Sequence, residues 1–262
     1  MVEAMATIES RLRSHRLTGI RLETTPVKAR VAIGRSKLGG HPDAPADFAW
    51  PTATRTANGK SLTAPLAFIG QIALADVARL DRDHLLPRAG SLLFFTLDAM
   101  RIYAAIGVVK KAGKTVPAET ATVVAHVAMG AKLVRRTPPA DLPASHIGPE
   151  SRLVFAKVET WPQVEGVVIG DPGKGVVKLP KAAWQSWAED AEPPPRQGML
   201  GHAYGCEFPI GMDPTSRLLL SVDAKASRLP GALFGRNGFL FFHAPEAALR
   251  AARWDEARHR EW

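Results

Sequence analysis

The residues of this chain that could do chemistry fall into a few short groups, of which residues 170–175 are the first. Their Gly, Asp and Lys content is similar to that of a phosphate-binding loop. Such a loop requires a glycine five residues before its Gly-Lys pair and a Ser or Thr after the pair, and this chain has Val168 and Gly175 at those positions. Because β-favouring residues follow, the segment is predicted to be a hairpin turn.

Nucleophilic and metal chemistry lack a complete set of residues as well. Ser36 lies in a partial nucleophile elbow, but Leu38 stands where the second glycine is required. The single cysteine, Cys206, lies four residues from His202 without a second cysteine, and we expect it to be a buried, inert thiol. The eight histidines form no zinc-binding spacing. The sequence therefore predicts no catalytic residue, no metal and no cofactor, and it favours a protein that is not an enzyme.

The loop from Ser36 to Pro51 is the most unusual segment. Gly39 and Gly40 permit positive φ or a close approach of another group, three prolines stiffen the remainder, and Trp50 offers a large flat surface. The loop is either a packed segment whose Trp50 closes the core or a binding surface. Gln71 raises the same question, since a buried amide must be hydrogen-bonded. We expect Gln71 to bond the backbone of this loop, with ligand contact as the alternative.

Short strands separated by Gly and Pro must position these residues, with a few helices beside them. The apolar run from Ser91 to Thr96 predicts a strand that is buried on both faces. Helices are predicted over residues 6–15, 75–85 and 181–190. Strands are predicted over residues 20–22, 28–33, 66–74, 91–96, 101–109, 121–127, 153–158, 167–169 and 176–179.

The pattern of residues 30–100 returns in residues 197–245, which indicates an internal duplication. Leu200-Gly201-His202 matches the turn at Leu38-Gly39-Gly40, and residues 238–242 match the aromatic strand at residues 90–95. Because an isolated strand pair is only marginally stable, the halves are expected to complete one shared core. The predicted fold class is α+β, with a β-rich, mostly antiparallel sheet built from two pseudo-repeats and a few peripheral helices. Residues 1–262 form a single domain in this interpretation, with a poorly matched middle over residues 105–195.

The excess of positive charge sits in two short segments. Lys and Arg number 34 against 25 Asp and Glu, a net charge of +9. Residues 1–40 and 110–136 each contribute a surplus of basic side chains, whereas the rest of the chain is nearly neutral. Solvated charged faces explain this pattern, and an acidic protein partner or weak binding of nucleic acid is the alternative. Nucleic acid would contact Arg11, Arg13, Arg16, Lys110, Lys111, Arg135 and Arg136.

Composition places the chain among soluble globular proteins. Apolar residues make up 46% and charged residues 23% of the 262 residues, which excludes collagen, coiled coils and disordered tails. One cysteine fits a reducing compartment, and no apolar run reaches the roughly 20 residues of a membrane helix. We therefore expect a cytoplasmic protein that does not enter membranes.

A long signature runs through the first half of the chain. It comprises residues 36–42 (Ser-Lys-Leu-Gly-Gly-His-Pro), Trp50-Pro51, residues 66–74 and residues 86–95. With the later strand at residues 219–223, this signature resembles the YwqG-like family, a bacterial domain of unknown function. Ser221 stands where that family has Gln, and Arg236 where it has Asp. The resemblance implies a duplicated α+β protein with largely antiparallel sheet and no established activity.

Three functions remain open at this stage. The first is a protein-interaction module without catalytic activity. The second is a small-molecule or carbohydrate binder, or an enzyme, with a cleft between the pseudo-repeats, and the third is a weak electrostatic nucleic-acid binder. The predicted binding residues are Ser36, Lys37, Gly39, Gly40, His41, Trp50, Gln71, Gly201, His202 and Asp223.

Overall fold

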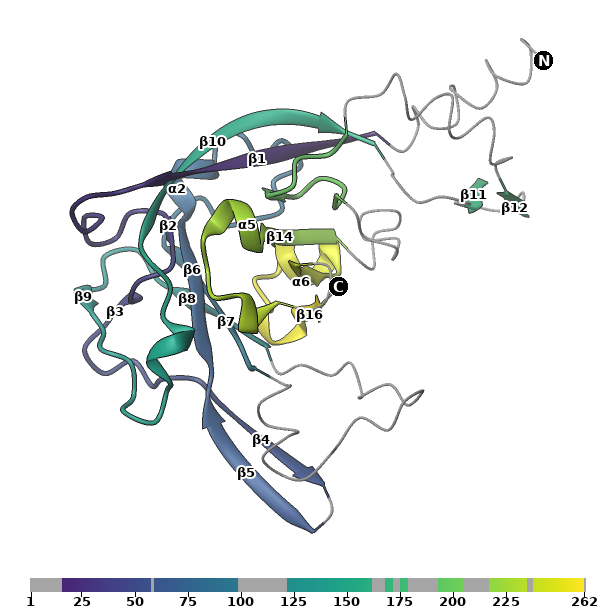
Figure 1. Cartoon of the computed structure of the whole chain (residues 1–262). Helices are drawn as coiled ribbons and strands as arrows, with labels where there is room; N and C mark the ends of the chain where they lie inside the picture. Colours follow the sequence, from purple (N-terminus) through teal and green to yellow (C-terminus); the bar gives the residue numbers. More distant parts are fainter. Residues whose placement is uncertain are drawn as a thin grey trace.

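The computed structural model describes residues 16–57, 59–98, 122–161, 168–171, 175–178, 193–204, 217–234 and 238–261. Most of the strands in these ranges join one large antiparallel sheet that curls on itself (Figure 1). The predicted β-rich, antiparallel architecture with few helices is confirmed. The predicted elements at residues 6–15, 101–109 and 181–190, and Cys206, lie outside the described residues.

Two long strands occupy the middle of the ten-stranded sheet, and the other strands follow outward on both sides. Figure 1 shows the two central strands, β1 and β10, as two long arrows side by side. The spatial order is β16 (Arg258–Glu261), β15 (Phe239–Ala244), β14 (Arg217–Asp223), β13 (Gly198–Met199), β1 (Leu17–Pro26), β10 (Ser151–Thr160), β2 (Lys37–Leu38), β6 (Ala67–Ala73), β7 (Ser91–Thr96) and β8 (Thr122–Val127).

β7 and β15, each the last strand but one at its end of the sheet, are covered on both faces. All six residues of β7 and of β15 are buried, as the Leu-Leu-Phe-Phe run predicts for β7. The curl of the sheet brings its two sides into one core, where the rings of Phe94 and Phe242 meet edge to face at 5.2 Å. Each fully buried Phe contributes about 1.5–3 kcal/mol of transfer free energy. The two halves of the chain therefore share one interior.

The helices are short. They are α2 (Leu74–Val77), α5 (Ala224–Ser227) and α6 (Glu246–Arg250), with 3₁₀ turns η1 (Ala144–His146), η2 (Gly231–Leu233) and η3 (Trp254–Glu256). The predicted helix over residues 75–85 is wrong beyond Val77. The buried carboxylate of Asp81 accepts hydrogen bonds from the backbone N–H groups of Leu85 and Leu86, so the chain turns instead of continuing the helix.

Two further segments differ from the sequence prediction. Residues 28–33 are a loop and not a strand, because the pairing of β1 with β10 ends at Pro26. The hairpin of β4 (Thr52–Ala57) and β5 (Lys60–Pro65) was not predicted, since most of its residues are polar. Ala53, Leu62 and Ala64 pack into a core cluster on one face, and cross-strand hydroxyl pairs such as Thr54–Thr63, 2.7 Å apart, stabilise the other.

Three short sheets complete the described strands. β11 (Val168–Asp171) and β12 (Gly175–Lys178) pair antiparallel, as predicted for the two strands of a hairpin, and residues 172–174 between them lie outside the described residues. β3 (Asp43–Ala44) pairs with β9 (Val134–Arg135), so Asp43 lies directly opposite Arg135. None of the helices in the described ranges is long and apolar enough to cross a membrane.

Candidate functional site

Residues 27–36, here called the pocket loop, leave β1 and return to the sheet at β2. Lys37, the first residue of β2, lies opposite Gln71 of β6 on one side and opposite Arg152 of β10 on the other. The loop therefore lies next to the point where the central strand β10 meets the first half of the sheet. What holds it there is a group of buried charges.

Lys37 is a fully buried lysine with two carboxylate partners. Its Nζ lies 3.2 Å from Asp43 Oδ2 and 3.1 Å from Glu150 Oε1. Arg135 contacts the same two carboxylates, with Nη1 2.7 Å from Glu150 Oε1 and Nε bonded to Asp43 Oδ1. The exposed fractions of the Lys37 and Asp43 side chains are 0%, and those of Glu150 and Arg135 are 10% and 13%. These four residues form an ionic cluster in which two cations balance two anions.

The burial of this cluster lowers the pKa of Lys37. Loss of hydration lowers the pKa of Lys37 below its ordinary value of 10.5, and the charges of Asp43 and Glu150 oppose that shift. Buried charges are tolerated only when they are paired and hydrogen-bonded. Removing either carboxylate would therefore leave an uncompensated cation in the interior.

The ionic cluster holds the pocket loop through the loop's backbone. Glu150 Oε2 accepts a hydrogen bond from Val31 N–H at 2.7 Å, and Arg135 Nη2 donates to the Val31 carbonyl oxygen at 2.7 Å. Asp43 Oδ2 accepts from Gly34 N–H at 3.0 Å. Both the N–H and the C=O of Val31 are thus satisfied by buried charged side chains, which give stronger hydrogen bonds than neutral groups do.

Gln71 fixes the last part of the pocket loop and the turn that follows it. Its Oε1 accepts from Asp43 N–H at 2.8 Å, and its Nε2 donates to the Arg35 carbonyl oxygen at 2.8 Å and to Asp43 Oδ2 at 2.9 Å. The expected role of Gln71, bonding the backbone of the glycine loop, is confirmed by these contacts.

The glycine pair that follows β2 is required by close packing. Gly39 has φ +68, and a Cβ at this position would lie 2.2 Å from the Pro149 carbonyl oxygen. Gly40 has φ +67, and its Cβ would lie 2.6 Å from Glu150 Cγ. Any larger residue at these positions would push the segment that carries Glu150 away from the ionic cluster.

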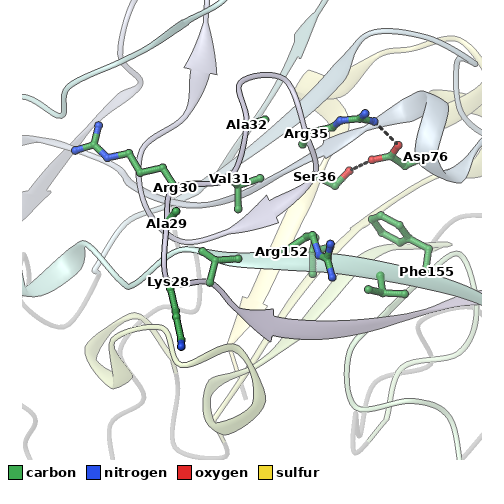
Figure 2. Close-up of a pocket in the computed structure, with 13 residues that line it drawn as sticks. Lys28, Ala29, Arg30, Val31, Ala32, Arg35, Ser36, Asp76, Arg152 and Phe155 are labelled. Carbon is green, nitrogen blue, oxygen red and sulfur yellow. Dashed lines mark hydrogen bonds and ion pairs between the residues drawn. The ribbon is translucent and has the colours of Figure 1, made fainter.

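A pocket of about 720 Å³ lies between the pocket loop, α2 and β10. Figure 2 shows Ser36, Arg35 and Asp76 across the pocket from Arg152 and Phe155, with Lys28 and Arg30 extending outward at its rim. Ser36 Oγ donates to Asp76 Oδ2 at 2.7 Å, and the Arg35 guanidinium lies 4.0 Å from Asp76 Oδ1. The full lining is Val27, Lys28, Ala29, Arg30, Val31, Ala32, Arg35, Ser36, Asp76, Arg152, Leu153, Val154 and Phe155.

A smaller pocket of about 200 Å³ shares Arg30 with the large pocket and is lined by His41. Gly40, Arg135, Ile147 and Glu150 complete its lining. Burial and the nearby charge of Arg30 lower the pKa of His41 below 6.5, so its imidazole favours the neutral form.

The structure brings together the predicted binding residues of the first half and separates the others from them. Ser36, Lys37, Gly39, Gly40, His41 and Gln71 all lie in or beside the ionic cluster. Trp50 packs edge to face on Phe95 at 5.5 Å, and its Nε1 donates to the Leu66 carbonyl oxygen. Trp50 thus closes a core cluster, as one of the two interpretations of its loop predicts.

The predicted residues of the second half lie beyond β1 in the sheet order: Gly201 and His202 follow β13, and Asp223 ends β14. Asp223 caps α5 by accepting from Lys225 N–H and Ala226 N–H, and it pairs with Arg196. His202 is buried and its N–H donates to Thr160 Oγ1 at 2.9 Å. Neither His202 nor Trp50 lines the two pockets described above. A common cleft with His41 and Gln71 therefore remains a prediction.

Most of the residues that line the large pocket were missed by sequence reasoning. Arg30 and Arg35 belong to the basic first segment, so the charge count offered a signal for them. The sequence contains no signal for Asp76 and Arg152, because nothing in the neighbouring residues distinguishes them from other surface charges. Among the described residues, no group of three or more His, Cys, Asp or Glu side chains could hold a metal ion.

Two comparisons with known proteins complete this description. No curated protein matches the chain. Residues 36–123, about a third of the 262 residues, match the model of DUF1963, a domain of unknown function. The matched segment includes Ser36, Lys37 and Asp43 but ends before Arg135, Glu150 and Arg152, so the described pocket combines residues inside and outside the DUF1963 match.

Proposed function

We propose that this chain is a binding protein that takes an anionic ligand in the pocket between the pocket loop and β10. The observation that carries the proposal is the charge of the lining, which has four cationic side chains and one carboxylate. Among the described residues, Lys28, Arg30 and Arg152 have no acidic partner. A concave site that is lined by charges of one sign attracts ligands of the opposite charge and raises their local concentration.

The size and the walls of the pocket fit an organic anion better than a bare ion. Ligand pockets typically enclose about 300–1,000 Å³ and combine apolar walls with a few placed polar groups. Here Val31, Val154 and Phe155 supply apolar surface beside Arg152. The ligand therefore carries at least one carboxylate or phosphate together with an apolar part.

We also infer that the two halves of the sheet are pseudo-repeats. On each side of the central β1–β10 pair the sheet has four described strands: β2, β6, β7 and β8 on one side, and β13, β14, β15 and β16 on the other. Each side contains a strand, a short helix and a second strand, namely β6–α2–β7 and β14–α5–β15. The strand pairing is irregular at Phe68/Gly70 and at Leu218/Leu220. Gly90 and Gly238, both with positive φ, accept from the first N–H of α2 and α5. In this correspondence β13 takes the place of β2, which shifts the match of the two turns by one residue from the one that the sequence predicts. Leu200, with φ 62, then takes the place of Gly39 and not of Leu38.

The proposed repeats differ where the anion would bind. Arg196 corresponds to Arg35, but it pairs with Asp223 and lies over the rings of Tyr204 and Phe239 at 5.0 and 4.8 Å. The Arg35 side chain is 70% exposed. Arg35 is more exposed than Arg196 and, among the described residues, its side chain has only the long 4.0 Å contact with Asp76, so the first-half arginine is the one that can meet a ligand, which supports a single anion site.

Nucleic acid is a weaker candidate because the arginines proposed for it are engaged. Arg135 belongs to the ionic cluster, and Arg136 donates to the carbonyl oxygens of Ala46 and Phe48. Arg11, Arg13, Lys110 and Lys111 lie outside the described residues.

Titration with citrate, followed by NMR shifts of the backbone amides, tests the proposal. We expect saturable shifts in the pocket loop and at residues 152–155, with affinity that falls as salt rises. Arg152→Gln should weaken binding by about tenfold or more, because a charge-assisted hydrogen bond contributes about 1.5–3 kcal/mol.

Lys60→Gln is the matched control, since Lys60 is an exposed cation in the separate β4–β5 hairpin (Figure 1). This variant should bind citrate as the unaltered protein does. Equal loss in both variants, or shifts confined to other surfaces, would remove the proposed site.

A further inference from the structure

One edge of β10 is only partly covered. β10 pairs with β1 over all ten of its residues, from Ser151 to Thr160. On the opposite edge, β2 pairs only with Ser151 and Arg152, and the last backbone contact is Leu153 N–H to the Ser36 carbonyl oxygen at 3.4 Å. Beyond that contact no described strand covers this edge.

The hydrogen-bonding groups of this edge follow from the strand pattern. Leu153 N–H points away from β1, and residues two apart along a strand point the same way. The N–H and C=O groups of Phe155 and Lys157 therefore also face away from β1. Among the described residues none forms a hydrogen bond with these four groups.

The large pocket lies at this open edge. Arg152 and Val154 belong to one face of β10, and Leu153 and Phe155 belong to the other, because side chains alternate along a strand. All four residues line the pocket. A pocket that reaches residues of both faces lies beside the strand, where Figure 2 shows Arg35 and Asp76 across from β10.

Apolar side chains continue along the same surface. A third pocket, of about 320 Å³, shares Arg35 and Asp76 with the large pocket. The large apolar side chains that are exposed in the described residues are Ile33, Met129 and Val154, and each lines one of these two pockets. Exposed apolar groups beside charged ones are typical of protein-interaction surfaces.

We propose that an extended acidic segment of a partner protein adds, as a further strand, to the edge of β10 that no described strand covers, with its carboxylates on Arg152 and Arg35. This inference rests on the proposed anion site and names its ligand class. The backbone of such a segment would satisfy the N–H and C=O groups of Phe155 and Lys157, which a small anion cannot do. An uncovered strand edge is otherwise a liability for aggregation.

The alternation of β10 also predicts the pattern of the segment. Acidic side chains belong on the face of Arg152 and Val154, and apolar side chains belong on the face of Phe155. A capped synthetic peptide of alternating Glu and Val is therefore the probe, and alternating Lys and Val is its charge control.

The experiment combines affinity with hydrogen exchange of the full chain. The Glu–Val peptide should bind and slow the exchange of the Phe155 and Lys157 amides by about tenfold or more. Arg152→Glu should weaken the binding by about tenfold or more, Lys60→Glu should leave it unchanged, and the Lys–Val peptide should not bind.

Methylated peptides separate strand pairing from simple charge attraction. In one series the Glu amides are N-methylated, and in the other the Val amides are. Strand addition requires that one series loses binding by about tenfold or more while the other keeps it, because only alternate amides face β10.

Equal binding of both series and of the parent peptide would overturn strand addition. Strand addition would also be overturned if citrate binds but the peptide does not slow the hydrogen exchange of the Phe155 and Lys157 amides. That result would leave the anion site intact. If neither citrate nor the peptide binds, the proposed function itself fails.

Discussion

Replacement of Lys37 by Met tests whether the ionic cluster holds the pocket loop. The change keeps a long apolar side chain but removes the buried cation. Asp43 and Glu150 then share only Arg135, and the cluster carries a net charge of −1. We expect the variant to be less stable and to hold the pocket loop less firmly.

The expected loss follows from the burial of the pair. Lys37 and Asp43 are fully buried, and the Lys37 Nζ contacts on both carboxylates are 3.1–3.2 Å. Removing one partner of a buried ion pair costs about 3–5 kcal/mol, because the other charge is left without compensation. Adding Glu150→Gln returns the cluster to neutrality, so the double variant should lose less than the sum of the two single variants by about 1 kcal/mol or more.

Urea unfolding of the three variants measures these free energies, and hydrogen exchange at Val31 and Gly34 reports on the loop. Lys37→Met should speed the exchange of both amides. A loss of less than about 1 kcal/mol, or strict additivity in the double variant, would refute a structural role for the cluster.

Other predictions concern packing and protonation. Gly39→Ala should destabilise the protein by about 1–3 kcal/mol more than Gly59→Ala in the same urea assay. Both glycines have positive φ, but a Cβ at Gly59 meets no atom within 4 Å. Equal losses would contradict the clash of a Gly39 Cβ with Pro149. Phe94→Ala and Phe242→Ala should each lower the free energy of unfolding by about 3–5 kcal/mol. The loss in the double variant should differ from the sum of the two single losses by about 0.5–1.5 kcal/mol, because the two rings are in contact. Strict additivity would place the rings in separate cores. NMR titration should find the pKa of His41 below 6.5, so that the His41 contribution to stability falls as pH drops through and below 6.5. A pKa of 6.5 or above would contradict the lowering of the pKa by burial and by the charge of Arg30.

The apolar strands could be predicted from the sequence because their signal is local. The run of Leu and Phe in residues 91–96 has no polar face, and the strand is buried throughout. Gln71 was also predictable, since an amide in an apolar strand needs partners that the adjacent loop can supply. Such inferences need only the residue and its near neighbours in the chain.

The ionic cluster and the pocket could not be predicted in the same way. Lysine is normally exposed, and the burial of Lys37 depends on Arg135 and Glu150, which lie about a hundred residues along the chain. Arg152 enters the pocket only because β10 pairs with β2. No spacing rule connects these residues, so long-range strand pairing had to be known first.

The side-chain Nε resonances of arginine, followed during citrate titration, test directly whether the pocket binds an anion. The signals of Arg152 and Arg35 should shift together with one binding curve, while the signal of Arg196, which is held by Asp223 and two aromatic rings, should stay in place. Unmoved signals of Arg152 and Arg35 at saturating citrate would contradict anion binding in the pocket.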